Sequence, residues 1–120
     1  MPTSIVTRPT GPTYALSVAN TQTLALGIPQ STNEPISYAE FLNASTTTVC
    51  VVIAPLASPA VTPTLAFPVA GVPTVPNSFI LGPSMQTPRV VPVPSNGFSV
   101  SAIGSAAGPA LVFITPVSVM

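Results

Sequence analysis

The chain has 120 residues, of which 47% are hydrophobic and only 3% are charged, whereas about a quarter are charged in an ordinary soluble protein. The charged side chains are Arg8, Glu34, Glu40 and Arg89, and there is no lysine, aspartate or histidine, so the formal net charge is zero. This composition is too apolar for intrinsic disorder, and two arginines are too few for nucleic-acid binding. A neutral, apolar-leaning surface instead predicts association with other subunits.

The uncharged stretch between Glu40 and Arg89 invites a membrane interpretation. Four prolines between residues 55 and 68 argue against it, because each removes a helical hydrogen bond and clashes with the preceding turn. The first nine residues lack both a basic region and an unbroken apolar run, so we expect no secretory signal. The length suits one domain.

Strand signals occur at eight places along the chain, and helix signals are nearly absent. The expected strands are Tyr14–Val18, Leu24–Ile28, Ile36–Asn43, Thr47–Ile53, Ser78–Leu81, Arg89–Val93, Phe98–Ile103 and Pro109–Thr115. Residues 49–53 are apolar on both faces, which predicts a central strand. Many short strands separated by turn signals favour an all-β fold, an antiparallel β-sandwich or jelly-roll-like single domain.

The last two expected strands look like the best hairpin of the sequence. Phe98, Val100 and Ala102 share one face while the residues between them share the other, and Ser105–Gly108 supplies turn residues before the next apolar run. The alternation predicts one buried face on this strand.

A proline-rich excursion interrupts the domain at about residues 55–76. Proline removes a backbone donor, which confines such a run to edges, bulges or extended connections. Its apolar side chains must still leave water, and we expect a partner to cover them. With the two arginines, the predicted partner contacts are Val61, Leu65, Phe67, Val69, Val72, Val75, Arg8 and Arg89. Residues 1–13 are expected to form an extended N-terminal arm, followed by the sandwich domain at 14–120.

The inventory of reactive side chains offers little for catalysis. Glu34 and Glu40 are interpreted as solvated or turn-located carboxylates rather than an acid–base pair. No histidine or lysine is available to activate a serine, so we expect no catalytic residue. Two glutamates and one cysteine do not make a metal site, and no cofactor is expected. Cys50 lies within an apolar run and is predicted to be a small buried residue.

Two further patterns have alternative interpretations. Asn43-Ala44-Ser45 matches a glycosylation acceptor, but Asn43 is interpreted as a turn residue that ends a strand. Arg8 and Arg89 either pair with a glutamate of the same chain or pair across a subunit contact.

The order of these features resembles the capsid cement or decoration proteins of tailed bacteriophages. The likeness extends over roughly residues 14 to 119 and lies in the strand layout and in the closing segment SAIGSAAGPALVFITP. It implies a β-sandwich that forms homo-oligomers, commonly trimers, on the outer capsid surface and bridges major capsid subunits. The implied site of assembly is the host cytoplasm, and the family has no catalytic residues. The chain departs from the pattern in the density of proline between Pro55 and Pro76.

Three other functions remain open. A tail, head-fibre or baseplate accessory protein would share the sandwich fold and the low charge. A secreted adhesin or carbohydrate-binding module would be expected to expose tryptophan or tyrosine platforms, but the chain has no tryptophan and two tyrosines. A hydrolase is the weakest alternative, and turnover that depends on Glu34 or Glu40 would support it.

Overall fold

The computed structural model describes residues 7–30, 36–56, 65–73 and 75–119. These residues form nine strands and no helix. The strands are β1 (Thr7–Pro9), β2 (Tyr14–Val18), β3 (Leu26–Pro29), β4 (Tyr38–Asn43), β5 (Val49–Pro55), β6 (Ser78–Leu81), β7 (Arg89–Pro92), β8 (Gly97–Gly104) and β9 (Ala110–Val119).

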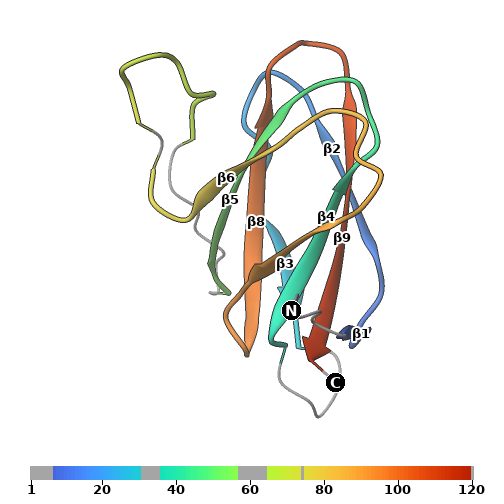
Figure 1. Cartoon of the computed structure of the whole chain (residues 1–120). Coiled ribbons are helices and arrows are strands. Elements are labelled where there is room, and N and C mark those ends of the chain that lie inside the picture. The colour runs from blue at the N-terminus through green and yellow to red at the C-terminus, as the bar shows by residue number, and fades with distance from the viewer. Residues whose placement is uncertain (1–6, 31–35, 57–64, 74, 120) are drawn as a thin grey trace, which may run out of the picture.

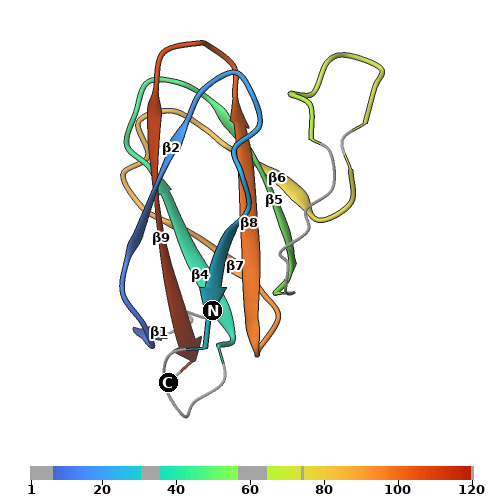
Figure 2. The same ribbon diagram turned by 180° about the vertical axis from the view of Figure 1, so that it is seen from behind.

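The strands make two antiparallel sheets that face each other, as Figures 1 and 2 show from opposite sides. Sheet A has the order β1-β9-β4-β7, with β2 also paired to β9, and sheet B has the order β3-β8-β5-β6. From β2 onward every connection crosses between the sheets except the one between β5 and β6, which are neighbours in sheet B. This order is that of a jelly roll, so the predicted fold class is confirmed.

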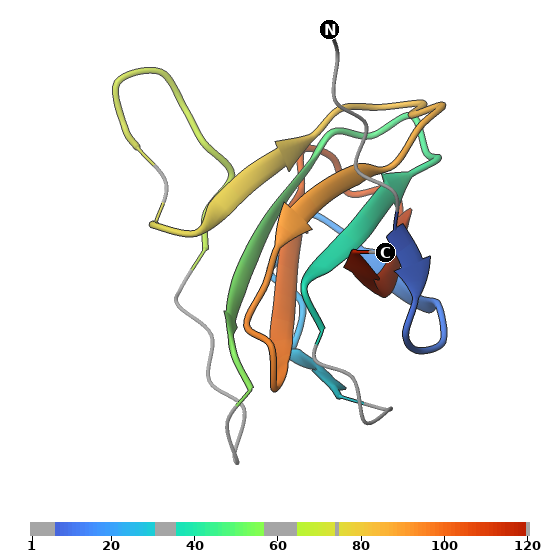
Figure 3. The same ribbon diagram turned by 60° about the horizontal axis from the view of Figure 1, so that its bottom comes forward.

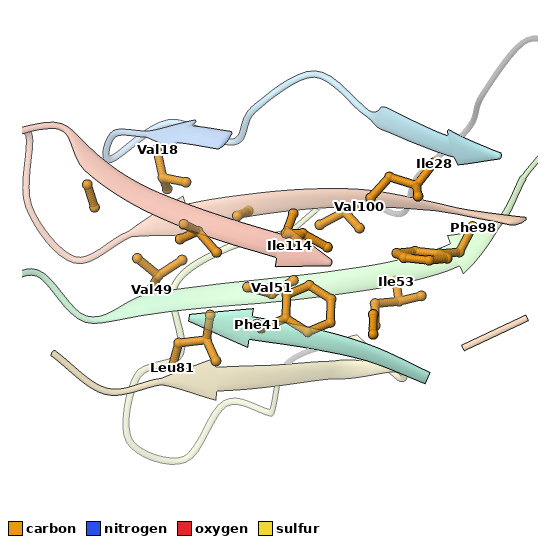
Figure 4. Close-up of a cluster of buried hydrophobic side chains, with 14 of the residues drawn as sticks. Val18, Ile28, Phe41, Val49, Val51, Ile53, Leu81, Phe98, Val100 and Ile114 are labelled. Carbon is orange, nitrogen blue, oxygen red and sulfur yellow. The ribbon is translucent and has the colours of Figure 1, made fainter. Parts of the chain in front are cut away.

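Alternation of side chains along the strands builds the core between the two sheets. In β4, for example, Ala39 and Phe41 are buried while their neighbours along the strand are half-buried. Phe41 of sheet A and Phe98 of sheet B lie among branched aliphatic side chains from both layers (Figure 4). Phe41 also meets Phe79 of β6 edge to face, with 5.1 Å between ring centres.

Strand β5 confirms the prediction of a central strand. It lies between β8 and β6, and all of Val49–Ile53 is buried. Val49, Val51 and Ile53 belong to the core between the sheets, whereas Cys50 and Val52 point to the outer face of sheet B and form a second, smaller cluster there. The buried environment predicted for Cys50 is confirmed as well.

Prolines lie where a missing backbone donor does little harm. Pro9, Pro29, Pro55 and Pro92 each end a strand. Pro116 lies inside β9, but its carbonyl accepts a 2.9 Å hydrogen bond from the Thr10 amide on the side where the pairing of β9 passes from β2 to β1. The missing N–H of Pro116 therefore falls on that interrupted side and leaves the ladder with β4 intact.

One sequence-based expectation changes. The predicted hairpin of Phe98–Ile103 with Pro109–Thr115 is wrong, because β8 pairs in sheet B and β9 pairs in sheet A. The connection between them arches over the end of the sandwich, so each strand finds its partners elsewhere in the chain. Residues 7–9 of the expected N-terminal arm form β1, which pairs with β9 so that Pro9 lies opposite Val117. Residues 1–6 lie outside the described part of the chain.

Within the described ranges, no helical segment has the length and apolar character that a helix needs to cross a bilayer.

Candidate functional site

The candidate functional regions are surfaces, and the first is the outer face of sheet A. It carries the side chains that alternate with the buried ones: Tyr38, Glu40, Leu42, Val90, Leu111, Phe113 and Thr115. We call this set the sheet-A face. Leu111 is 43% exposed, Val90 is similarly exposed, and Leu42, Phe113 and Tyr38 are half-buried. An apolar row thus crosses the sheet from β9 to β4.

Glu40 is the one charged residue of the sheet-A face. It is half-buried in the middle of β4, and its register partners are Val90 on one side and Thr115 on the other. At the β2 edge, Thr115 shares a 2.8 Å hydroxyl–hydroxyl hydrogen bond with Thr13. Glu34, the other predicted carboxylate, lies outside the described residues.

The second surface is the described part of the proline-rich excursion, residues 65–73 and 75–77, which we call the strap. It leaves the sandwich beside β5 and β6 (Figures 1 and 3). Its tip is a turn in which the Val72 amide donates to the Val69 carbonyl at 3.1 Å, and Gly71 takes a φ of +81° that suits glycine. Val69 and Val72 are 64% and 59% exposed.

The base of the strap is covered by its own domain rather than by a partner. Leu65 is only 4% exposed and packs with Cys50 and Val52 on the outer face of sheet B, and Phe67 and Val75 are half-buried against the same cluster. Leu65 was expected to need a neighbouring subunit, because an extended loop rarely has its own core. The outward-facing side chains of β5 supply that core.

The third region is a groove of about 380 Å³ at the open edge of the sandwich, where β6 of sheet B faces β7 of sheet A. Its walls include Ile53, Asn77, Phe79, Arg89 and Val91. The Arg89 guanidinium donates to the Ile80 carbonyl at 3.0 Å, and its central carbon lies 5.0 Å from the centre of the Phe79 ring. Arg89 therefore links the two sheets across this edge, in addition to being exposed.

The predicted site residues do not gather in one place. Leu65, Phe67 and Val75 form the base of the strap, Val69 and Val72 form its tip, and Arg89 lies at the edge groove. Arg8 is an exposed residue of β1, paired in register with Ser118. Val61 lies outside the described residues.

Sequence reasoning missed the sheet-A face. Leu111 and Phe113 alternate with Ala110, Val112 and Ile114, so the strand is apolar on both faces. That signal predicts either a covered strand or an interaction surface, whereas the hairpin prediction uses only one face of the strand.

Asn43, the last residue of β4, has a structural role. Asn43 is fully buried, and its Nδ2 donates to the carbonyls of Thr47 at 2.7 Å and Gly82 at 3.2 Å. Its Oδ1 accepts from the amide and the hydroxyl of Ser45. The interpretation as a strand-ending turn residue is confirmed, and the amide is not accessible to glycosylation in the folded chain.

Chemistry-bearing groups are sparse in the described part of the chain. No three side chains of the metal-ligating types come together among those residues. Burial raises the pKa of the Cys50 thiol, because the thiolate is poorly solvated in an apolar cluster.

Comparison of the chain with protein-family models, with curated proteins and with solved structures gave no match.

Proposed function

We propose that the chain is a structural virion protein, a capsid decoration protein that assembles with copies of itself and with major capsid subunits on the outer surface of the shell. The observation that supports this most directly is a difference between the outer faces of the two sheets. The strap covers Cys50 and Val52 on the outer face of sheet B. No described strap residue packs on the sheet-A face, which presents apolar side chains with Glu40 as the charged member of the set.

An apolar face of this kind favours contact with another protein subunit over exposure to water. Monomers rarely expose large contiguous apolar patches, and such patches mark interfaces. A standard interface buries about 1,600 Å² in total, and its apolar part contributes about 25 cal/mol per Å² before association costs are subtracted. On a capsid each subunit contact is repeated many times, so even a modest gain per contact holds the shell subunits together.

The jelly-roll topology gives secondary support, because the architecture is common in viral capsid proteins. It also occurs in lectins, so fold alone does not assign the function. The sheet-A face supports assembly over sugar binding, since Tyr38, its one aromatic residue of the sugar-stacking kind, is half-buried.

The first experiment measures the mass of the protein in solution by sedimentation equilibrium. We expect an oligomer, with a trimer as the leading size, that Leu111→Lys and Val90→Lys dissociate by placing a charge on the sheet-A face. Leu24→Lys is the matched control, because Leu24 is a 92% exposed leucine in the loop between β2 and β3, away from that face. A wild-type monomer at high concentration would contradict self-assembly.

The second experiment locates the protein on purified virions by antibody labelling and electron microscopy. A decoration protein labels the outer capsid surface, whereas label on the tail or on head fibres would assign it to another virion structure. A protein absent from particles would contradict the proposal as a whole.

A further inference from the structure

The strap packs on the sandwich through a contact set that is separate from the main core. Cys50, Val52 and Leu65 form their own cluster, joined by Phe67, Val75 and Ile103. Sheet B lies between this cluster and the core, so the strap can leave without removing any side chain that packs between the two sheets.

Gln22 holds the base of the strap to the body. Its Oε1 accepts a 2.7 Å hydrogen bond from the Leu65 amide, while its Nε2 donates to Ser101 Oγ of β8 at 3.0 Å. Ser101 Oγ in turn donates to the Thr23 carbonyl at 2.7 Å. One side chain thereby connects the strap, the β2–β3 loop and the outer face of sheet B.

The outer face of β8 also carries a buried polar group that lies outside the Cys50 cluster. Ser99 lies on the outer face of β8, in register with Gly27 and Ala54, and its hydroxyl is buried without a hydrogen-bond partner in the described structure. Its register neighbour Gly27 lies against the Leu56 side chain, so this hydroxyl belongs to the part of the face next to Leu56 and does not bear on how the strap is held.

The tip of the strap adds little to its attachment. Val69 and Val72 are mostly exposed, and the tip stands away from both sheets (Figures 1 and 3). Leu65 makes the main contacts of the strap with the outer face of sheet B, with lesser contributions from Phe67 and Val75. Where the strap joins β6, the Ile53 amide also donates to the Asn77 carbonyl at 3.2 Å.

We propose that the strap is a latch: it opens as a unit while the sandwich stays folded, and Gln22 and Leu65 keep it closed. Opening uncovers an apolar strip on the outer face of sheet B that includes Cys50, Val52 and Ile103. In the closed state the strap therefore covers a second apolar surface of the sandwich, which becomes accessible when the strap opens. This inference does not depend on the virion assignment, because it concerns the isolated protein.

The buried thiol of Cys50 reports latch opening directly. The test measures the rate at which an aromatic disulfide reagent labels Cys50 in the full chain at fixed pH, without denaturant. Gln22→Ala removes the anchoring hydrogen bond and is expected to speed labelling about 3- to 10-fold. Leu65→Ala removes the buried anchor and is expected to speed it by at least about 30-fold.

Ile114→Val is the matched control. Ile114 is a fully buried core residue of β9, and its loss of one methylene destabilises the whole sandwich by an amount similar to the loss of one hydrogen bond. A local latch leaves labelling of Ile114→Val within about twofold of wild type. Val69→Ala at the exposed tip is also expected to label at the wild-type rate.

Two outcomes would overturn the latch. If Ile114→Val speeds labelling as much as Gln22→Ala does, Cys50 is reached only through global unfolding. If neither Gln22→Ala nor Leu65→Ala speeds labelling, the strap does not control access to this face. Urea unfolding of every variant verifies that each one is folded under the labelling conditions.

Discussion

The buried amide of Asn43 ties together three chain segments: the end of β4, the turn that leads to β5, and the loop after β6. Its two donors and its carbonyl oxygen are all engaged. The acceptors belong to a half-buried residue, Thr47, and an exposed one, Gly82, while the Asn43 side chain that joins them is itself fully buried. The residue therefore fixes the position of loops that have no regular structure of their own.

Asn43→Ala is expected to lower the free energy of unfolding by about 2–4 kcal/mol, since it removes several hydrogen bonds made by one fully buried side chain. Urea unfolding followed by circular dichroism measures the loss. Asn96→Ala, at an exposed asparagine before β8, is expected to change stability by less than about 0.5 kcal/mol. Equal effects of the two substitutions would contradict the structural role of Asn43.

Cys50 makes stability depend on pH in the alkaline range. Burial raises the pKa of its thiol in the folded state, whereas the unfolded chain releases the proton near pH 8.5. Below that pH both states are protonated and stability is unaffected. As pH rises above it, only the unfolded state loses its proton, so the unfolding free energy falls by up to about 1.4 kcal/mol per pH unit.

Urea titrations between pH 7.5 and 9.5 check this linkage. The wild type is expected to lose stability over the upper part of that range, and Cys50→Ala is expected to have a flat profile from a lower starting stability. A wild-type profile as flat as that of the variant would show that the thiol ionises equally well in both states.

At the scale of elements, β6 and β7 are the edge strands of their two sheets at one side of the sandwich, and neither pairs with a strand of the other sheet. Arg89 of β7 spans this edge, since its guanidinium reaches the Ile80 carbonyl and lies over the Phe79 ring. Phe79 in turn contacts Phe41 of sheet A. The contacts of these side chains hold the two sheets together at this edge.

Arg89→Ala is expected to destabilise the protein by about 1 kcal/mol, because an exposed cation–π contact and a hydrogen bond of a charged donor are each modest. Arg89→Lys is expected to restore only part of the loss, since lysine keeps the charge but lacks the planar donor group. Thermal unfolding measures both. Gln86→Ala, at an exposed site of the adjoining loop, should leave the melting temperature unchanged.

Local patterns predicted the strands well and their partners poorly. Tyr14–Val18 and Ser78–Leu81 have the expected bounds, and the other six expected strands overlap the observed ones. Partner choice depends on contacts distant in the chain, which is why an apparent hairpin of β8 and β9 turned out to span two sheets. No alternation pattern distinguishes a turn within a sheet from an arch between sheets.

The candidate surfaces were predictable in part. A strand that is apolar on both faces needs a cover, and the two-sided character of Val49–Ile53 was recognised. That the proline-rich excursion supplies the cover through Leu65 requires three-dimensional proximity, which the sequence does not contain. The same two-sided character in β9 has no such cover from the strap, and it marks the sheet-A face.

At the scale of the whole molecule, the scarcity of charge governs how association responds to the solvent. The four ionisable side chains that carry charge at neutral pH sum to zero, and no histidine is present. Long-range electrostatic attraction or repulsion between copies is therefore weak. The chain also lacks histidine, the residue type that ordinarily changes charge between pH 6 and pH 8.

The dissociation constant of the proposed oligomer is expected to change less than about twofold between low and moderate concentrations of sodium chloride, because screening acts on exposed charges. Added sulfate is expected to tighten association, since it strengthens the burial of apolar surface. Sedimentation at a series of salt concentrations measures both effects. A strong weakening by sodium chloride would place charged residues, such as Arg8, at the centre of the interface.

The position of β9 in sheet A has a consequence for biosynthesis. Its three partners β1, β2 and β4 all precede it in the chain, and it lies between them. Sheet A cannot form until residues 110–119 have been synthesised. Until then the earlier strands of this sheet leave the ribosome with their apolar side chains exposed. We expect folding to be completed late, after translation of this last strand, and nascent chains stopped short of it to be the form most dependent on chaperones.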